Sequence, residues 1–107
     1  MNVLAPKPWT QDEFFTWAER QEGSFEFDGF QPVAMTGGTV AYAIVIRNLH
    51  RALDARLHGT SSQPLGPDAG VATVDQAVRY PDALITCSKL ELESRTVPGV
   101  IVAANAT

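Results

Sequence analysis

The feature that most limits the fold of this chain is its longest helix-forming segment. The segment is GGTVAYAIVIRNLHRALDARLHG, in which Gly37-Gly38 and the capping residue Thr39 stand at the start and Gly59 supplies a stop at the end. Apolar side chains recur along it with helical spacing, at Ile46, Leu49, Leu53 and Leu57. The pattern predicts one long amphipathic helix between Thr39 and Gly59.

Shorter elements precede this helix. In TQDEFFTWAERQEG, Thr10 and Glu13 have the spacing of a capping box, which predicts a helix that ends near Gly23. In SFEFDGFQPVAMT, apolar residues alternate with polar ones up to the turn signal Asp28-Gly29. This second segment predicts a strand, a tight turn and a second strand.

Short apolar segments follow the long helix. They are QPL at 63–65, VATV at 71–74, AVRY at 77–80, DALITC at 82–87 and VIVA at 100–103. The order of helix, hairpin, helix and several strands predicts an α+β fold and not repeated βαβ units. The length of 107 residues suits one domain spanning 1–107.

Composition narrows the classes of partner. With a net charge of −4, the chain lacks the basic surface that nonspecific nucleic-acid binding requires. A nuclease is not excluded, because a bound metal ion can supply positive charge. A single cysteine excludes an internal disulfide and agrees with a reducing cytoplasm. The longest apolar run is interrupted by Arg47, and it is too short to cross a bilayer, so no membrane partner is expected.

Three carboxylates stand beside apolar strand segments: Glu26, Asp68 and Asp82. Mg²⁺ prefers oxygen ligands and commonly uses one or two carboxylates with water. Carboxylates at strand ends are more often simply solvated, so the pattern by itself favours solvated carboxylates, with a metal site as the alternative.

Other polar and aromatic residues favour structural roles. His50 and His58 are predicted to be surface residues, Cys87 a small buried side chain, and Trp9, Trp17 and Phe14 parts of core or helix-entry packing. TGGT is too short for a phosphate-binding loop, and no serine, lysine or histidine spacing indicates a nucleophile with its base.

Several segments in order resemble the bacterial Uma-two family of restriction-endonuclease-like proteins. They are TQDEFFTWAERQEGSFEFDGFQPVAMTGGT, AIVIRNLHRAL, GPDAGV and RYPDALITC. The resemblance implies a mixed sheet flanked by helices, of the PD-(D/E)xK nuclease type, and cleavage of DNA with Mg²⁺. It implies that Asp82, after Pro81, and Glu26 are the catalytic and metal-binding residues. Asp68 is a weaker match, and Tyr42 stands where many relatives have histidine.

The chain departs from that family near its last strand. VIVAANAT stands where the family has an apolar run leading to a glutamate, so the second acidic strand residue and the downstream lysine have no match here. We therefore expect a fold that is incomplete at the C-terminus, as in a truncated frame, and impaired cleavage. One alternative is a noncatalytic pseudonuclease or protein-interaction module that assembles through its exposed last strand, for example as a homo-oligomer. Another alternative is the nonfunctional product of a pseudogene.

Overall fold

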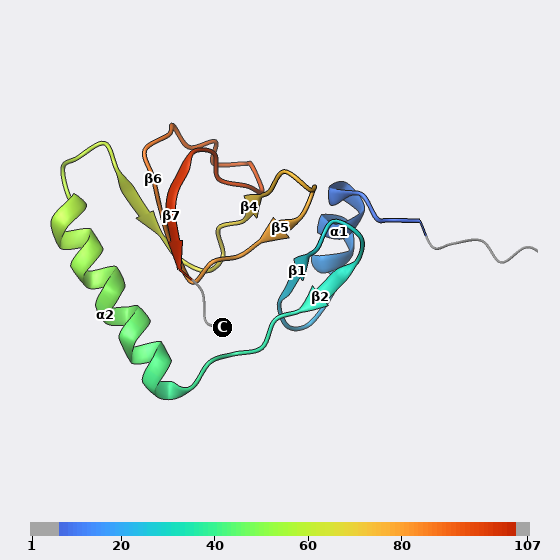
Figure 1. Cartoon of the computed structure of the whole chain (residues 1–107), viewed down its shortest axis with the longest axis horizontal. Coiled ribbons are helices and arrows are strands. Elements are labelled where there is room, and N and C mark those ends of the chain that lie inside the picture. The colour runs from blue at the N-terminus through green and yellow to red at the C-terminus, as the bar shows by residue number, and fades with distance from the viewer. Residues whose placement is uncertain (1–6, 105–107) are drawn as a thin grey trace, which may run out of the picture. The chain divides into compact units, whose positions relative to one another are not determined.

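A computed structural model describes residues 7–104 of the chain as an α+β protein, which confirms the predicted class (Figure 1). The elements are α1 (Gln11–Ala18), β1 (Phe25–Phe27), β2 (Pro32–Ala34), α2 (Val40–Leu57), β3 (Gln63–Leu65), β4 (Val71–Ala72), β5 (Val78–Arg79), β6 (Ala83–Thr86) and β7 (Val100–Ala104). Contacts between residues divide the chain into two compact units. The first unit is Met1–Thr36 with Thr73–Arg79, and the second is Gly37–Ala72 with Tyr80–Thr107.

The first unit begins with the predicted capping box. The Thr10 hydroxyl accepts the Glu13 N–H at 3.1 Å, and the Glu13 carboxylate accepts the Thr10 N–H at 2.9 Å. Both bonds satisfy backbone donors that the first turn of a helix leaves without partners. They explain why α1 begins at Gln11.

The predicted hairpin is also present in the first unit. β1 and β2 pair antiparallel, with Glu26 opposite Val33, and β5 joins the other side of β1 through Phe27 and Val78. Oδ1 of Asp28 accepts the N–H groups of Phe30 and of Gln31, both at 2.8 Å, and so closes the turn.

Aromatic packing holds α1 to this sheet. Phe14 and Phe27 are both fully buried, and their rings stack at 5.3 Å with an interplanar angle of 16°. Ala77 and Val78 are buried with them. The prediction that Phe14 belongs to the core is confirmed.

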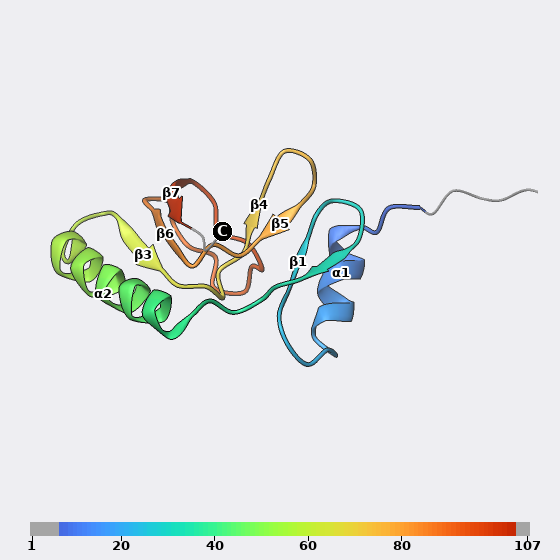
Figure 2. The ribbon, with the colours of Figure 1, turned by 60° about the horizontal axis from the view of Figure 1, so that its bottom comes forward.

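The second unit is built on α2 and a three-stranded antiparallel sheet of order β3-β6-β7. Thr39 caps α2 by accepting the Tyr42 N–H at 3.1 Å. The helix lies along β3, and its predicted apolar stripe is half-buried (Figure 2). No residue of α2 is fully buried, and the strand that α2 contacts most is β3, at an edge of this sheet.

β6 is the central strand of this sheet, and three of its four side chains are buried. Ala83 and Leu84 are buried, and Thr86 is a fully buried polar residue. The Thr86 hydroxyl donates to the carbonyl of Pro98 at 2.7 Å and also lies 3.1 Å from the carbonyl of Gly99, while it accepts the Ser88 N–H at 3.2 Å. These bonds tie the loop that leads into β7 to the end of β6.

The burial prediction for Cys87 is wrong. Cys87 was expected to be a small buried side chain at the end of this strand, and it is exposed. β6 ends at Thr86, so Cys87 lies beyond the last position that the sheet covers. Its sulfur lies 2.6 Å from the hydroxyl oxygen of Ser62. Among residues 7–104, no helix is long and apolar enough to cross a membrane.

Candidate functional site

Asp82 lies directly before β6, between two buried residues. Pro81 and Ala83 are both buried, whereas Asp82 itself is half-buried. Proline lacks an N–H group and so commonly stands at the start of a strand. The local sequence therefore places Asp82 at the start of β6, the central strand of the sheet in the second unit.

Tyr42 is the side chain that meets this carboxylate. Its hydroxyl donates to Oδ2 of Asp82 at 2.9 Å, from the first turn of α2. A Cβ atom on Gly38 would lie only 2.9 Å from the ring of Tyr42, so the absence of a side chain at Gly38 leaves room for that ring. Gly38 thus has a packing role in the position of Tyr42, whereas a Cβ atom on Gly37 would meet no atom within 4 Å.

The environment of Tyr42 favours its neutral form. Reduced access to water raises the pKa of the Tyr42 hydroxyl, and the hydrogen bond to the Asp82 carboxylate and its negative charge raise this pKa further. Tyr42 therefore remains a hydrogen-bond donor to Asp82 throughout the neutral pH range.

His50 holds the backbone of the same residue. Its Nε2 lies 3.0 Å from the carbonyl oxygen of Asp82, and because a carbonyl can only accept, Nε2 carries the proton. The prediction that His50 is a surface residue is wrong, since it is half-buried against the start of β6, whereas His58 is exposed as expected. Tyr42 and His50 thus bind the side chain and the backbone of Asp82 from one helix.

Glu26 belongs to the first unit. It lies in the middle of β1, its side chain is 17% exposed, and its Oε1 is 3.6 Å from Nη1 of Arg79 in β5. Asp68 lies in the loop between β3 and β4 and is exposed. The structure therefore brings Tyr42 and His50 to Asp82, and it pairs Glu26 with a guanidinium group.

The donor atoms near Asp82 do not form a complete metal cage. Within residues 7–104, no three histidine, cysteine, aspartate or glutamate side chains gather closely enough to hold a metal ion. Asp82 can supply one carboxylate, and Mg²⁺ in phosphoryl-transfer sites often takes one or two carboxylates while water and phosphate oxygens fill the remaining positions. Asp82 fits the role of a single ligand but not of a full site.

Sequence reasoning singled out Asp82 but missed the role of His50. A signal was present, because Tyr42 and His50 extend the same half-buried side of α2 that Ile46, Leu49 and Leu53 define. A histidine on the packed side of a helix is more informative than one on its solvated side.

Comparisons with known proteins do not identify this arrangement. No family model, no curated protein and no solved structure matches the chain.

Proposed function

We propose that this chain is a restriction-endonuclease-like protein whose Asp82 site derives from Mg²⁺-dependent cleavage of DNA, and that it cleaves DNA weakly or not at all. The observation that carries the proposal is the Asp82 carboxylate, held at the start of a central strand by Tyr42. It supports the PD aspartate that the sequence resemblance implies. The pairing of Asp82 with Glu26 rests on that resemblance alone.

The chemistry of this proposal needs a metal that the protein holds and orients. Bound Mg²⁺ would stabilise charge on a scissile phosphate and activate water. Asp82 would hold the ion, with Glu26 as the second carboxylate. Tyr42 would orient the Asp82 carboxylate through Oδ2, and His50 would hold the backbone beneath it.

The strands beside β6 support the expectation of weak cleavage. In the register of β6 with β7, Ala83 pairs with Ala104 and Leu84 with Ala103. On the other side, Leu84 pairs with Leu65 of β3. The described positions beside the start of β6 thus carry no acidic residue, and a PD-(D/E)xK site needs such an acid to complete its metal ligands.

A Mg²⁺-dependent plasmid-nicking assay tests the activity. We expect little or no nicking by the wild type, by Asp82→Ala, and by the control Asp54→Ala, whose acid is exposed on α2. Robust wild-type nicking that is lost only in Asp82→Ala would establish the nuclease but overturn its impairment.

Cation binding tests the site independently of cleavage. Calorimetric titration with Mg²⁺ and Mn²⁺ should give weak binding that Asp82→Asn and Glu26→Gln both reduce, while Asp68→Asn leaves it unchanged. Equal binding by all of these variants would overturn the carboxylate pair. Asparagine retains an oxygen acceptor for the Tyr42 hydroxyl, so Asp82→Asn changes the charge with little change of shape.

One observation favours a second candidate function, that of an interaction module. β7 forms an edge of the described sheet of the second unit, and a strand edge can pair with another chain. If β7 pairs with a second copy, light scattering should show a dimer that Ile101→Lys dissociates. The control Val74→Lys, at a fully exposed turn position, should leave the dimer intact. A monomeric wild type would contradict this function.

A further inference from the structure

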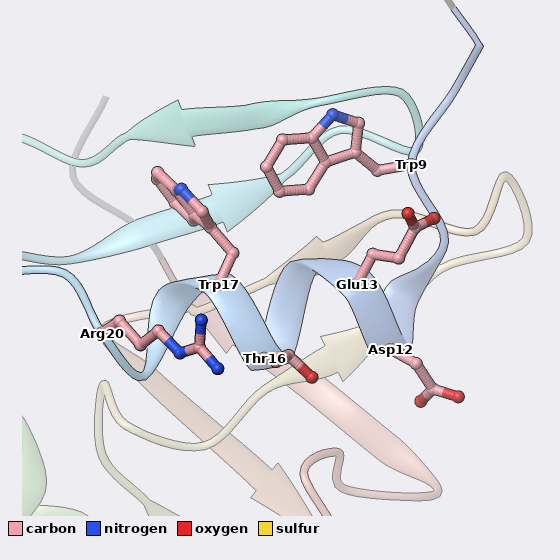
Figure 3. A pocket seen from close by; sticks show the side chains of 6 residues that line it. All are labelled: Trp9, Asp12, Glu13, Thr16, Trp17 and Arg20. Carbon is pink, nitrogen blue, oxygen red and sulfur yellow. The ribbon is translucent and has the colours of Figure 1, made fainter.

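A hollow on the first unit has no part in the proposed nuclease site. It lies over α1, has a volume of about 490 Å³, and is lined by Trp9, Asp12, Glu13, Thr16, Trp17 and Arg20. Figure 3 shows both indole rings on the same side of the helix, with Glu13 beside Trp9 and Arg20 beside Trp17. The volume is within the range of sites for small molecules.

The two indole rings are held in place without any ligand. They meet edge to face, with centroids 5.6 Å apart and an interplanar angle of 87°. Trp17 also meets the ring of Phe25 edge to face at 4.7 Å. The backbone N–H of Trp9 donates to the carbonyl of Phe30 at 2.8 Å, which holds the backbone of Trp9 beside the hairpin. Two perpendicular aromatic walls are therefore preorganised, which lowers the entropy cost of binding.

The charges around the hollow select the sign of a ligand. Asp12 and Glu13 place two carboxylates in the first turn of α1, against one guanidinium from Arg20. The two acids outweigh the partial positive charge of the helix N-terminus. The faces of indole rings are electron-rich and attract cations, most strongly cations that are weakly hydrated.

We propose that this hollow binds a small alkylated ammonium cation, of the quaternary type that choline represents. The cation would lie against the indole rings at the end of the hollow that Glu13 occupies. Its alkyl groups would contact the rings, and the carboxylates would compensate its charge without a directed hydrogen bond. The proposal does not depend on the nuclease assignment, because none of the residues that line the hollow belongs to the proposed nuclease site.

Fluorescence titration of the full chain with choline tests the proposal directly. Both tryptophans of the chain line the hollow, so a ligand that binds there should change their emission. We expect saturable binding of choline, and binding about tenfold weaker for its neutral isostere, in which carbon replaces the nitrogen. Equal binding of the two compounds would overturn the proposal, because the hollow would then be merely apolar.

Charge variants sharpen the test. Glu13→Gln should weaken choline binding several-fold while it keeps the capping bond to the Thr10 N–H, since glutamine serves as well in a capping box. Arg20→Gln should strengthen binding, because it removes the opposing cation. The control Glu22→Gln changes an exposed acid outside the hollow and should have no effect. No change in Glu13→Gln and Arg20→Gln, or binding of a trimethyllysine peptide without binding of choline, would contradict a small-cation site.

Discussion

The interactions that stabilise each unit internally differ between the two units. The first closes around a stacked pair of buried phenylalanines, Phe14 and Phe27. In the second, the long helix buries no residue fully, and directed polar bonds at Asp82 and Thr86 link its parts. Apolar packing stabilises a core, but the packed side chains carry no reactive group. A hydrogen bond, in contrast, can hold a reactive group in a defined place.

This difference can be measured because the tryptophans and the tyrosines lie in different units. Both tryptophans of the chain lie in the first unit, and both tyrosines, Tyr42 and Tyr80, lie in the second. Tryptophan fluorescence therefore reports on the first unit, and second-derivative absorbance, which resolves the tyrosine bands from those of tryptophan, reports on the second. These two signals measure the stability of each unit separately.

The largest effect is expected from the aromatic stack. Phe14→Ala removes a fully buried ring and should cost the first unit about 3–5 kcal/mol in free energy of unfolding. Urea denaturation followed by tryptophan fluorescence measures this loss. The control Phe30→Ala, at a ring that is 41% exposed, should cost much less. Similar losses in the two variants would show that the stack is not the core of this unit.

A smaller loss is expected at the hairpin of the first unit. Gly29 has a φ of +92°, and a Cβ atom there would lie 2.5 Å from the carbonyl oxygen of Asp75. Gly29→Ala should destabilise the unit by about 2–3 kcal/mol, from the left-handed backbone and the backbone contact together. Gly23→Ala has a similar φ of +85° with open space around it, so it isolates the backbone cost. If both variants lose equal stability, the contact with Asp75 contributes nothing.

The corresponding test in the second unit concerns its buried hydroxyl. Thr86→Val keeps the shape of the side chain but leaves the Ser88 N–H and the Pro98 carbonyl without the partner they have now. We expect a loss of about 1–2 kcal/mol, detected by tyrosine absorbance during urea denaturation. Thr86→Ser keeps the hydroxyl and should retain the polar part of this energy. A valine variant as stable as the wild type would contradict the importance of polar links here.

The same contrast explains what could be predicted from the sequence. The capping box at Thr10 and the Asp28-Gly29 turn depend on residues within a few positions of each other, and both were predicted. The bond from Tyr42 to Asp82 joins residues 40 positions apart, and no local pattern encodes it. The exposure of Cys87 depends on where β6 ends, which pairing with neighbouring strands decides.

The candidate site was likewise predictable only in part. Asp82 could be selected because an acid after proline at an apolar strand is unusual, and the resemblance supplied a reason for it. Which side chains meet Asp82 follows from how α2 lies against the sheet, and this is a tertiary property. The link of Glu26 to Asp82 stays a prediction, and Arg79 as the ionic partner of Glu26 was not foreseen.

The smallest expected effect is an opposite pH dependence of the two units. In the first unit, the N–H groups of Gln31 and Phe30 lower the pKa of Asp28, and the Thr73 hydroxyl lowers that of Asp75, from 3.8. The stability these acids contribute is present above pH 3.8 and is lost as the pH falls through their lowered pKa values. In the second unit, the pKa of Tyr42 is raised from 10.0, so its contribution is present below pH 10.0 and is lost as the pH rises through the raised value.

Urea midpoints measured against pH with the two optical signals test this contrast. Acid should lower the tryptophan midpoint, and Asp28→Asn should reduce that dependence, because asparagine can accept the same N–H bonds without a charge to lose. Alkali should lower the tyrosine midpoint, and Tyr42→Phe should remove that part of the dependence, while Tyr80→Phe should retain it. If Tyr42→Phe and the wild type respond alike to alkali, the bond from Tyr42 to Asp82 is not formed in solution. The second unit would then lack the hydrogen bond that holds the Asp82 carboxylate. The two units would differ mainly in how much apolar surface they bury.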